Sequence, residues 1–306
     1  MPDAKDIAVV EEEKLASPIS TSFESLPSFR SDPRSSLVFL ATAAERANRF
    51  EDMCKYASAL VTLTIAQKCD LNSDERILFS VAFKNTVGDR RTCWRALHSD
   101  PATPFDDLVQ HYRKTVEQEL KCICSDALSL LEKLLALPDL STSASVFYLK
   151  MCGDYHRYGA ELFVYDYSAQ SPNGEEEAKE EEKQKEEKEQ ETEKQKAEHH
   201  EKTKAIEFYE KALHLAETKL ESTDPTRLGL ALNASVCYYE ILKDRKRACE
   251  LAKGAFDAAI SDLNHLSMDT YKDSTLILQL LRDNMVLWMH DSSTLPSVPG
   301  EYADED

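Results

Sequence analysis

The sequence predicts an all-α fold of about nine antiparallel helices, and three observations support that prediction. Apolar residues recur at three- and four-residue spacing in one long segment after another. Only 7 of the 306 residues are glycine, which is few for the turns that a sheet-rich fold needs. Ser, Asp, Asn and Pro residues stand between the periodic segments, where helices begin and end.

The first half of the chain contains a polar arm and then a series of helical segments. Residues 1–34 are rich in Ser, Pro and acidic residues and lack periodicity, so we expect a disordered arm. Residues 35–67 form one periodic run with almost no turn signal. Asn72 then restarts a helix, with Glu75 three residues later as in a capping box. The next helical run ends at Pro138, and another spans 141 to about 167.

The second half opens with a charged insert, residues 171–204, that is nearly pure Glu, Lys and Gln after its first residues. Its composition fits either a solvated charged helix or a disordered acidic loop. Amphipathic spacing then returns, and Asp224 with Pro225 predicts the start of a further helix. Residues 291–306 are predicted to form a disordered acidic tail, which leaves one helical domain at 35–290.

Composition excludes several classes of protein. The formal net charge of -19 argues against general binding to nucleic acid or to anionic membranes. No run of about 18 apolar residues is present, so we expect no membrane insertion. The eight cysteines are scattered without a C-x-x-C pair, which favours reduced thiols packed in helices. The expected compartment is the cytosol, with the nucleus left open.

Motifs for catalysis are missing as well. The sequence has no Walker A loop, no G-x-S-x-G, no H-E-x-x-H and no Cys/His set with metal spacing. We therefore expect a protein that is not an enzyme and that needs no cofactor and no metal.

A basic cluster at residues 84–95 stands out in this acidic chain. Lys84 and Arg91 are seven residues apart, so a helix places them on nearly one face. Arg95 follows four residues later on nearly the same stripe, whereas Arg90 lies a quarter-turn away. The stripe therefore groups three of the four cations.

The same spacing recurs between Lys150 and Arg157, with Tyr158 adjacent. Asp154 lies between the two cations, where it can orient either of them. Two such helices could converge on one compact anion, for which a dianionic phosphoserine or phosphothreonine is the natural candidate. The spacing leaves a second interpretation open, in which these cations lie on solvated faces or pair with local acids such as Asp89 and Glu161.

Two apolar rows lie in later helices. One joins Leu228, Leu232, Val236 and Glu240, and the other joins Leu276, Leu280, Asn284 and Trp288. Such rows are typical of a core. A polar residue in or beside each row, Asn233 and Asn284, also fits hydrogen bonding to the backbone of an extended peptide.

Five blocks, at 75–95, 126–135, 145–162, 224–242 and 271–288, resemble the 14-3-3 family in order and spacing. Among them are "AFKNTVGDRRTCWR", "LKMCGDYHRYGAEL" and "STLILQLLRDNMVLW". The resemblance covers about residues 37–288, apart from the charged insert. It implies a cup-shaped nine-helix subunit with an amphipathic groove, a homodimer or heterodimer, and an adaptor that binds phosphorylated Ser/Thr motifs of client proteins.

The resemblance also implies site residues. The phosphate contacts would be Lys84, Arg91, Arg157 and Tyr158, to which the spacing adds Arg95 and Asp154 as supporting residues. The peptide contacts would be Lys150, Asn233, Glu240 and Asn284, with an apolar wall of Leu232, Val236, Leu276, Ile277, Leu280 and Trp288. The dimer interface would include Arg49, Asp52, Cys93, Tyr112 and Glu119.

Departures from the family pattern concentrate outside that pocket. Asp52 would face Thr115, where the family has a lysine, and Cys93 stands where many members have a serine. Gly159 is expected to interrupt its helix just after Tyr158. The alternative function is a helical scaffold that binds unphosphorylated acidic or C-terminal peptides, and dependence on phosphate distinguishes the two.

Overall fold

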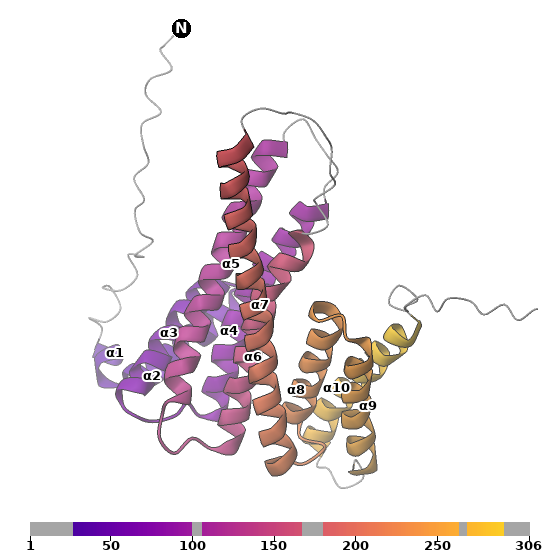
Figure 1. Cartoon of the computed structure of the whole chain (residues 1–306). Coiled ribbons are helices and arrows are strands. Elements are labelled where there is room, and N and C mark those ends of the chain that lie inside the picture. The colour runs from indigo at the N-terminus through magenta and orange to yellow at the C-terminus, as the bar shows by residue number, and fades with distance from the viewer. Residues whose placement is uncertain (1–26, 100–105, 167–179, 263–267, 291–306) are drawn as a thin grey trace, which may run out of the picture.

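The computed structural model describes residues 27–99, 106–166, 180–262 and 268–290, and every regular element in these ranges is a helix (Figure 1). The all-α prediction is therefore confirmed. The predicted tail, most of the predicted arm and residues 171–179 of the insert lie outside the described residues.

The first helices are α1 (Pro27–Ser31), α2 (Pro33–Arg46) and α3 (Phe50–Ala66). Helical structure begins before residue 35 because Asp32 accepts a hydrogen bond from the Ser35 amide at 3.0 Å and Pro33 occupies the first helical turn. The periodic run over 35–67 does not form the one uninterrupted helix that its lack of turn signals suggested. Asn48, with φ of 54°, turns the chain between α2 and α3. Asparagine tolerates that left-handed conformation better than most residues.

Three long helices follow: α4 (Ser73–Ser99), α5 (Asp106–Leu135) and α6 (Thr142–Asp166). The predicted capping box is present, since Glu75 N donates to Asn72 Oδ1 at 3.0 Å and Asn72 N donates to Glu75 Oε2 at 2.8 Å. The expected interruption at Gly159 was wrong, because α6 runs through that residue. Packing against neighbouring helices offsets the low helix propensity of a single glycine.

The longest element is α7 (Glu180–Lys219), a 40-residue helix that joins the later part of the charged insert to the next amphipathic segment. The sequence left the insert either helical or irregular, and residues 180–204 of it are helical. Helix α7 packs more extensively on α6 than on any other element, and the two lie side by side (Figure 1).

The C-terminal group comprises α8 (Pro225–Val236), a short π-helical turn (Cys237–Ile241), α9 (Arg245–Asp262) and α10 (Met268–His290). The start of α8 is as predicted: Asp224 Oδ1 accepts from the Thr226 amide at 2.7 Å, and Pro225 follows it. No helix among the described residues is long and apolar enough to cross a lipid bilayer.

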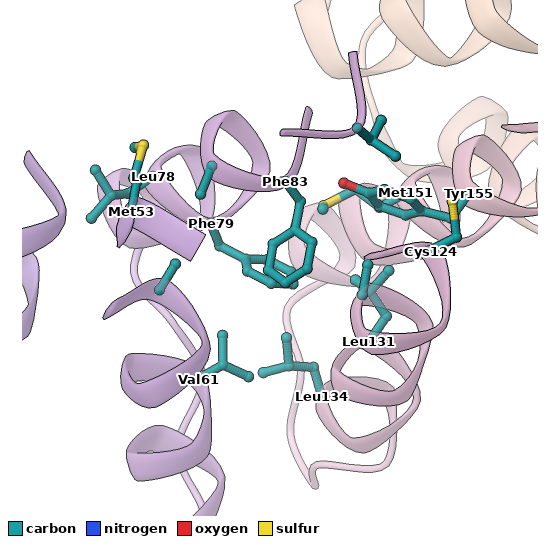
Figure 2. Packing of buried hydrophobic residues seen from close by; sticks show 14 of the residues in the cluster. Met53, Val61, Leu78, Phe79, Phe83, Cys124, Leu131, Leu134, Met151 and Tyr155 are labelled. Carbon is teal, nitrogen blue, oxygen red and sulfur yellow. The ribbon is translucent and has the colours of Figure 1, made fainter. Parts of the chain in front are cut away.

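Three buried clusters hold these helices together in chain order. The first joins α2 to α6, where the Phe79 ring meets Phe83 edge-on at 5.1 Å and Phe83 meets Tyr155 at 6.3 Å (Figure 2). The second joins α6, α7 and α8, and the third joins α8, α9 and α10. Helix α6 belongs to both of the first two clusters, so its residues are fixed from two sides.

Candidate functional site

The two cation-bearing helices meet at Tyr158. Arg91 from α4 places its Cζ 4.2 Å from the Tyr158 ring centroid, and Arg157 from α6 places its Cζ 4.6 Å from the same centroid. The Tyr158 ring in turn packs edge-on against Tyr155 at 5.7 Å. An aromatic series that begins in the buried core thus ends under two guanidinium groups.

Glu161 of α6 forms ion pairs with two arginines of α4, Arg91 and Arg95. Its Oε2 accepts from Arg91 Nε at 2.7 Å, and its Oε1 accepts from Arg95 Nε at 2.6 Å. The Glu161 side chain is only 7% exposed, so these are charge-assisted bonds in a largely water-free setting. The pairing with Glu161 that the sequence left open as an alternative is therefore present for Arg91 and Arg95, and Arg91 also lies over the Tyr158 ring.

Asp154 is the second buried carboxylate of the site. It accepts hydrogen bonds from Lys150 Nζ at 2.8 Å, from Tyr209 Oη at 2.6 Å and from Asn233 Nδ2 at 2.7 Å. Arg157 Nη2 lies 3.7 Å from the same carboxylate. Burial alone would raise the pKa of Asp154, but the positive charges of Lys150 and Arg157 and the donated hydrogen bonds hold it below its ordinary value.

Lys84 lies two turns before Arg91 on α4, with its side chain exposed to solvent. Arg90, by contrast, turns away from this group: it forms ion pairs with Glu51 and Glu119, the latter at 2.8 Å from Arg90 Nε. Within α4 the spacing therefore separates the cations as expected, with Arg91 and Arg95 directed to α6 and Arg90 directed to α3 and α5.

Apart from Lys150 on α6, the predicted peptide contacts come from α8, the π-helical turn and α10. Leu276 and Leu280 are exposed, at 65% and 45%, and Glu240 in the π-helical turn is exposed as well. The half-buried members of the set are Leu232, Asn233, Val236, Ile277 and Asn284. Trp288 differs: it is 3% exposed and stacks on Tyr239 at 4.8 Å, so it offers little surface to a peptide.

The burial of Trp288 has a geometric cause. Residues four apart on a helix are rotated by about 40° from one another, so a row of four such residues turns by about 120° from end to end. Leu276 at the start of the row consequently faces solvent, whereas Trp288 at its end faces the third buried cluster.

The predicted dimer residues lie on α3, α4 and α5, and in the single chain several already have partners. Asp52 is buried and accepts from Arg49 Nε at 2.6 Å and from Lys55 Nζ at 3.2 Å. Cys93 and Tyr112 are exposed, and Glu119 pairs with Arg90. A pocket of about 260 Å³ opens beside them, lined by Asn48, Arg49, Phe50, Glu51, Asp52, Thr86, Asp89 and Arg90.

The sequence analysis missed three residues that contact the site from α6 and α7. Tyr209 contacts Asp154 and Arg157, Gly153 lies directly beneath the Tyr209 ring, and Glu201 contacts His156, the residue before Arg157. A glycine next to Asp154 in a glycine-poor chain was a usable signal. Tyr209 gave none, since it lies 52 residues after Arg157.

Among the described residues, no group of three His, Cys, Asp or Glu side chains is arranged to hold a metal ion. What the site does offer is a cluster of guanidinium, ammonium and phenol groups on a rigid base, which suits a compact anion.

The comparisons with known proteins agree with this geometry. The family model described as 14-3-3 protein matches residues 40–190 and 187–289. The 14-3-3 protein homolog 2 of Echinococcus granulosus is 44% identical over 264 residues, which cover 85% of this chain and 92% of that protein. The 14-3-3-like protein 1 of Caenorhabditis elegans is 43% identical over 266 residues, covering 85% and 93%. The 14-3-3 protein theta of Homo sapiens is 40% identical over 265 residues, covering 85% and 94%. A model match across most of the helical domain and relatives this similar show that the chain belongs to the 14-3-3 family.

Proposed function

We propose that this chain is an adaptor, without catalytic activity, that binds phosphorylated Ser/Thr motifs of client proteins. Membership of the 14-3-3 family supports a phosphopeptide-binding adaptor role in general. In the proposal, Lys84, Arg91, Arg157 and Tyr158 hold the phosphate, and Arg95 and Asp154 support them. The client peptide lies extended between α6 and the faces of α8 and α10.

The observation that carries the proposal is the convergence of Arg91 and Arg157 on one ring. Two guanidinium groups from different helices, each within 4.6 Å of the same centroid, repel one another unless anions lie nearby. Arg95 and Lys150 add two further positive charges, and the carboxylates of Glu161 and Asp154 balance two of the four in the free protein. A dianionic phosphate supplies the remainder, and each arginine offers it a planar fork of donors.

The apolar side of the proposed site rests on α10. Leu276 and Leu280 are large apolar side chains left exposed on one stripe of that helix. Exposed leucines that recur on one face are typical of a binding surface rather than of a solvated helix. Asn233, Glu240, Asn284 and Lys150 supply the polar contacts in the proposal, and Leu232, Val236 and Ile277 extend the apolar wall.

We further propose that the chain acts as a dimer, with itself or with a paralogue, in the cytosol or the nucleus. The face of α3, α4 and α5 that carries Arg49, Asp52, Cys93, Tyr112 and Glu119 would form the interface. The 14-3-3 family forms dimers in general, and two linked sites gain affinity for a client that carries two phosphorylated motifs.

The test is fluorescence anisotropy with a phosphoserine peptide and its unphosphorylated twin. We expect the wild-type chain to bind only the phosphopeptide, and Arg91→Glu or Arg157→Glu to weaken that binding at least about 100-fold, since each removes charge-assisted bonds and adds repulsion. Arg282→Glu is the matched control, because Arg282 is 57% exposed on α10 and pairs with its neighbour Asp283. Circular dichroism verifies that each variant is folded.

Equal affinity of the wild-type chain for both peptides would contradict the proposal. Binding that depends on peptide charge but not on phosphate, and that tolerates Arg91→Lys, would instead indicate the scaffold for unphosphorylated acidic peptides.

A further inference from the structure

We propose that Tyr209 is a positioning residue for the phosphate pocket, acting from α7 without touching the client peptide. The inference rests on the proposed function and adds to it a residue outside the predicted site. Tyr209 is 1% exposed, so a peptide on the surface does not reach it.

The hydroxyl group of Tyr209 joins two site residues. It donates a hydrogen bond to Asp154 Oδ1 at 2.6 Å and accepts one from Arg157 Nε at 3.2 Å. Burial, and then the charge of Asp154, raise the pKa of the Tyr209 phenol well above its ordinary value. The phenol therefore remains a neutral donor throughout the pH range in which proteins work.

Gly153 makes this arrangement possible. A Cβ atom built on Gly153 would lie 2.7 Å from both Cδ1 and Cε1 of the Tyr209 ring, far inside a normal contact distance. Glycine consequently lets the α7 ring lie flat against the α6 backbone, one residue before Asp154. The position of the hydroxyl is fixed by that close approach.

The neighbouring contacts of α7 fall on the same stretch of α6. The Phe208 ring stacks on His156 at 5.5 Å with an interplanar angle of 9°, and His156 Nδ1 lies 2.8 Å from Glu201 Oε2. A Cβ on Gly159 would lie 2.8 Å from that Glu201 oxygen. Residues 201–209 of α7 thus support residues 153–159 of α6, the two turns that carry Asp154, Arg157 and Tyr158.

Positioning matters here because an Arg157 side chain that is already ordered loses less conformational entropy when it binds a phosphate. Its side chain is 8% exposed and is contacted at Nε by Tyr209 and at Nη2 by Asp154. Holding a long side chain in its bound rotamer reduces the entropy lost on binding. Without the hydroxyl, Arg157 Nε loses a buried acceptor and Asp154 loses a donor, so both side chains rearrange.

The test is Tyr209→Phe, which keeps the ring and removes only the hydroxyl. We expect its affinity for the phosphoserine peptide to fall about tenfold relative to wild type, while the unphosphorylated twin remains unbound by both chains. Tyr148→Phe is the matched control: Tyr148 is also a fully buried tyrosine, on α6, and its hydroxyl donates to Asp70 Oδ1 at the same 2.6 Å. It contacts none of the predicted phosphate residues, so its loss should lower stability without lowering phosphate affinity.

A second measurement needs no variant. In the wild-type protein without peptide, we expect the Nε–H of Arg157 to exchange with solvent much more slowly than that of the exposed Arg282, since it is buried and hydrogen-bonded to Tyr209. Exchange of both groups at one rate would overturn the positioning role even if Tyr209→Phe failed to fold.

The outcomes separate the two proposals. A wild-type chain that prefers the phosphopeptide, with Tyr209→Phe binding it equally well, overturns the role of Tyr209 alone. Equal losses of affinity in Tyr209→Phe and Tyr148→Phe overturn it too, because they indicate general destabilisation. A wild-type chain without phosphate preference overturns the proposed function, and the Tyr209 role with it.

Discussion

Asp154 is buried, accepts three hydrogen bonds and lies beside the cations Lys150 and Arg157, so its charge state should affect the stability of the protein. Because its pKa in the folded chain lies below its ordinary value of 3.8, Asp154 binds its proton more weakly in the folded than in the unfolded state. Its contribution to stability is present above about pH 4 and is lost as the pH falls through the folded-state pKa.

Asp154→Asn tests this residue. We expect the variant to lose about 3 kcal/mol of unfolding free energy at neutral pH, since it leaves Lys150 and Arg157 without their buried anion. As the pH falls below the ordinary value of 3.8, the wild-type chain begins to lose this contribution, so the difference in unfolding free energy between the two chains should narrow. Urea unfolding of both chains at pH 7 and near pH 3 measures it, and a difference that does not change with pH would contradict the account.

Gly153 and Gly88 offer a paired comparison of glycine to alanine in two helices. At Gly153 the new methyl group meets the Tyr209 ring at 2.7 Å, whereas at Gly88 it meets nothing within 4 Å. We expect Gly153→Ala to lower the unfolding free energy by roughly 1–3 kcal/mol, the cost of overpacking. Gly88→Ala should raise it by roughly 0.5–1 kcal/mol, as alanine does in a helix. Thermal melting of the two variants and of the wild-type chain measures these changes. A Gly153→Ala variant as stable as the wild-type chain would mean that the Tyr209 ring is not tightly held.

For single residues, the sequence predicted which side chains share a face of a helix, because helical periodicity determines that. Seven-residue spacing placed Arg91 and Arg157 on the faces that meet at Tyr158. Two of the acids that it offered as partners, Asp154 and Glu161, do pair with these cations. It could not predict the contact with Tyr209, because that contact depends on how α6 and α7 pack. The same limit explains Trp288, whose burial follows from helix rotation and the position of α9 and α10.

Helix α7 is the element that the sequence described least well. Composition left residues 171–204 either helical or irregular, and the structure joins residues 180–204 to the following amphipathic segment in one helix. Tertiary contacts near its middle stabilise it, notably those of Glu201 with His156. Nearby, Ala197 and Glu201 line a pocket of about 410 Å³ between α5, α6 and α7. Ala197 and Glu201, in the later turns of the charged segment, thus supply contacts between that segment and α5 and α6.

Two deletions test whether the later turns of the charged segment, and not its earlier part, stabilise the fold. Removing residues 175–191 should leave the melting temperature and phosphopeptide affinity unchanged, because the contacts of Ala197, Glu201 and Tyr209 remain. Removing residues 175–203 also deletes the Glu201 partner of His156, and we expect a loss of roughly 1 kcal/mol in stability. Equal effects of the two deletions would contradict the account, whether both are neutral or both are harmful.

The short break between α2 and α3 shows the opposite limitation. The periodic run at 35–67 carried almost no turn signal, and a single Asn48 in the left-handed conformation sufficed to divide it. By contrast, the starts of α4 and α8 were predicted correctly, since Asn72 with Glu75 and Asp224 with Pro225 carry their signals locally.

For the whole molecule, the three buried clusters determine which parts act together. Helix α6 shares the first cluster with α2 to α5 and the second with α7 and α8, so its Lys150–Glu161 stretch is held from both sides. Asp52, on the proposed dimer face, is paired with Arg49 and Lys55 of its own chain. An interface formed there has to accept or replace these pairs, which makes the choice of partner sensitive to the residue opposite Asp52.

The charge of the whole chain complements the local site. With a net charge of -19, the surface repels polyanions, while Arg91, Arg95, Lys150 and Arg157 lie beside two buried carboxylates. In the proposed function, this distribution favours one phosphate on a peptide over a nucleic acid, whose many phosphates meet the negative remainder of the surface.

The central claim is that a single phosphate decides whether a client peptide binds. The most direct test is a calorimetric titration of the wild-type chain with a phosphoserine peptide at physiological salt, repeated after phosphatase treatment of the same peptide. The account predicts a saturable complex before treatment and a loss of at least about 100-fold in affinity afterwards, because the removed dianion is the ligand of Arg91 and Arg157. An affinity that is unchanged by dephosphorylation would contradict it.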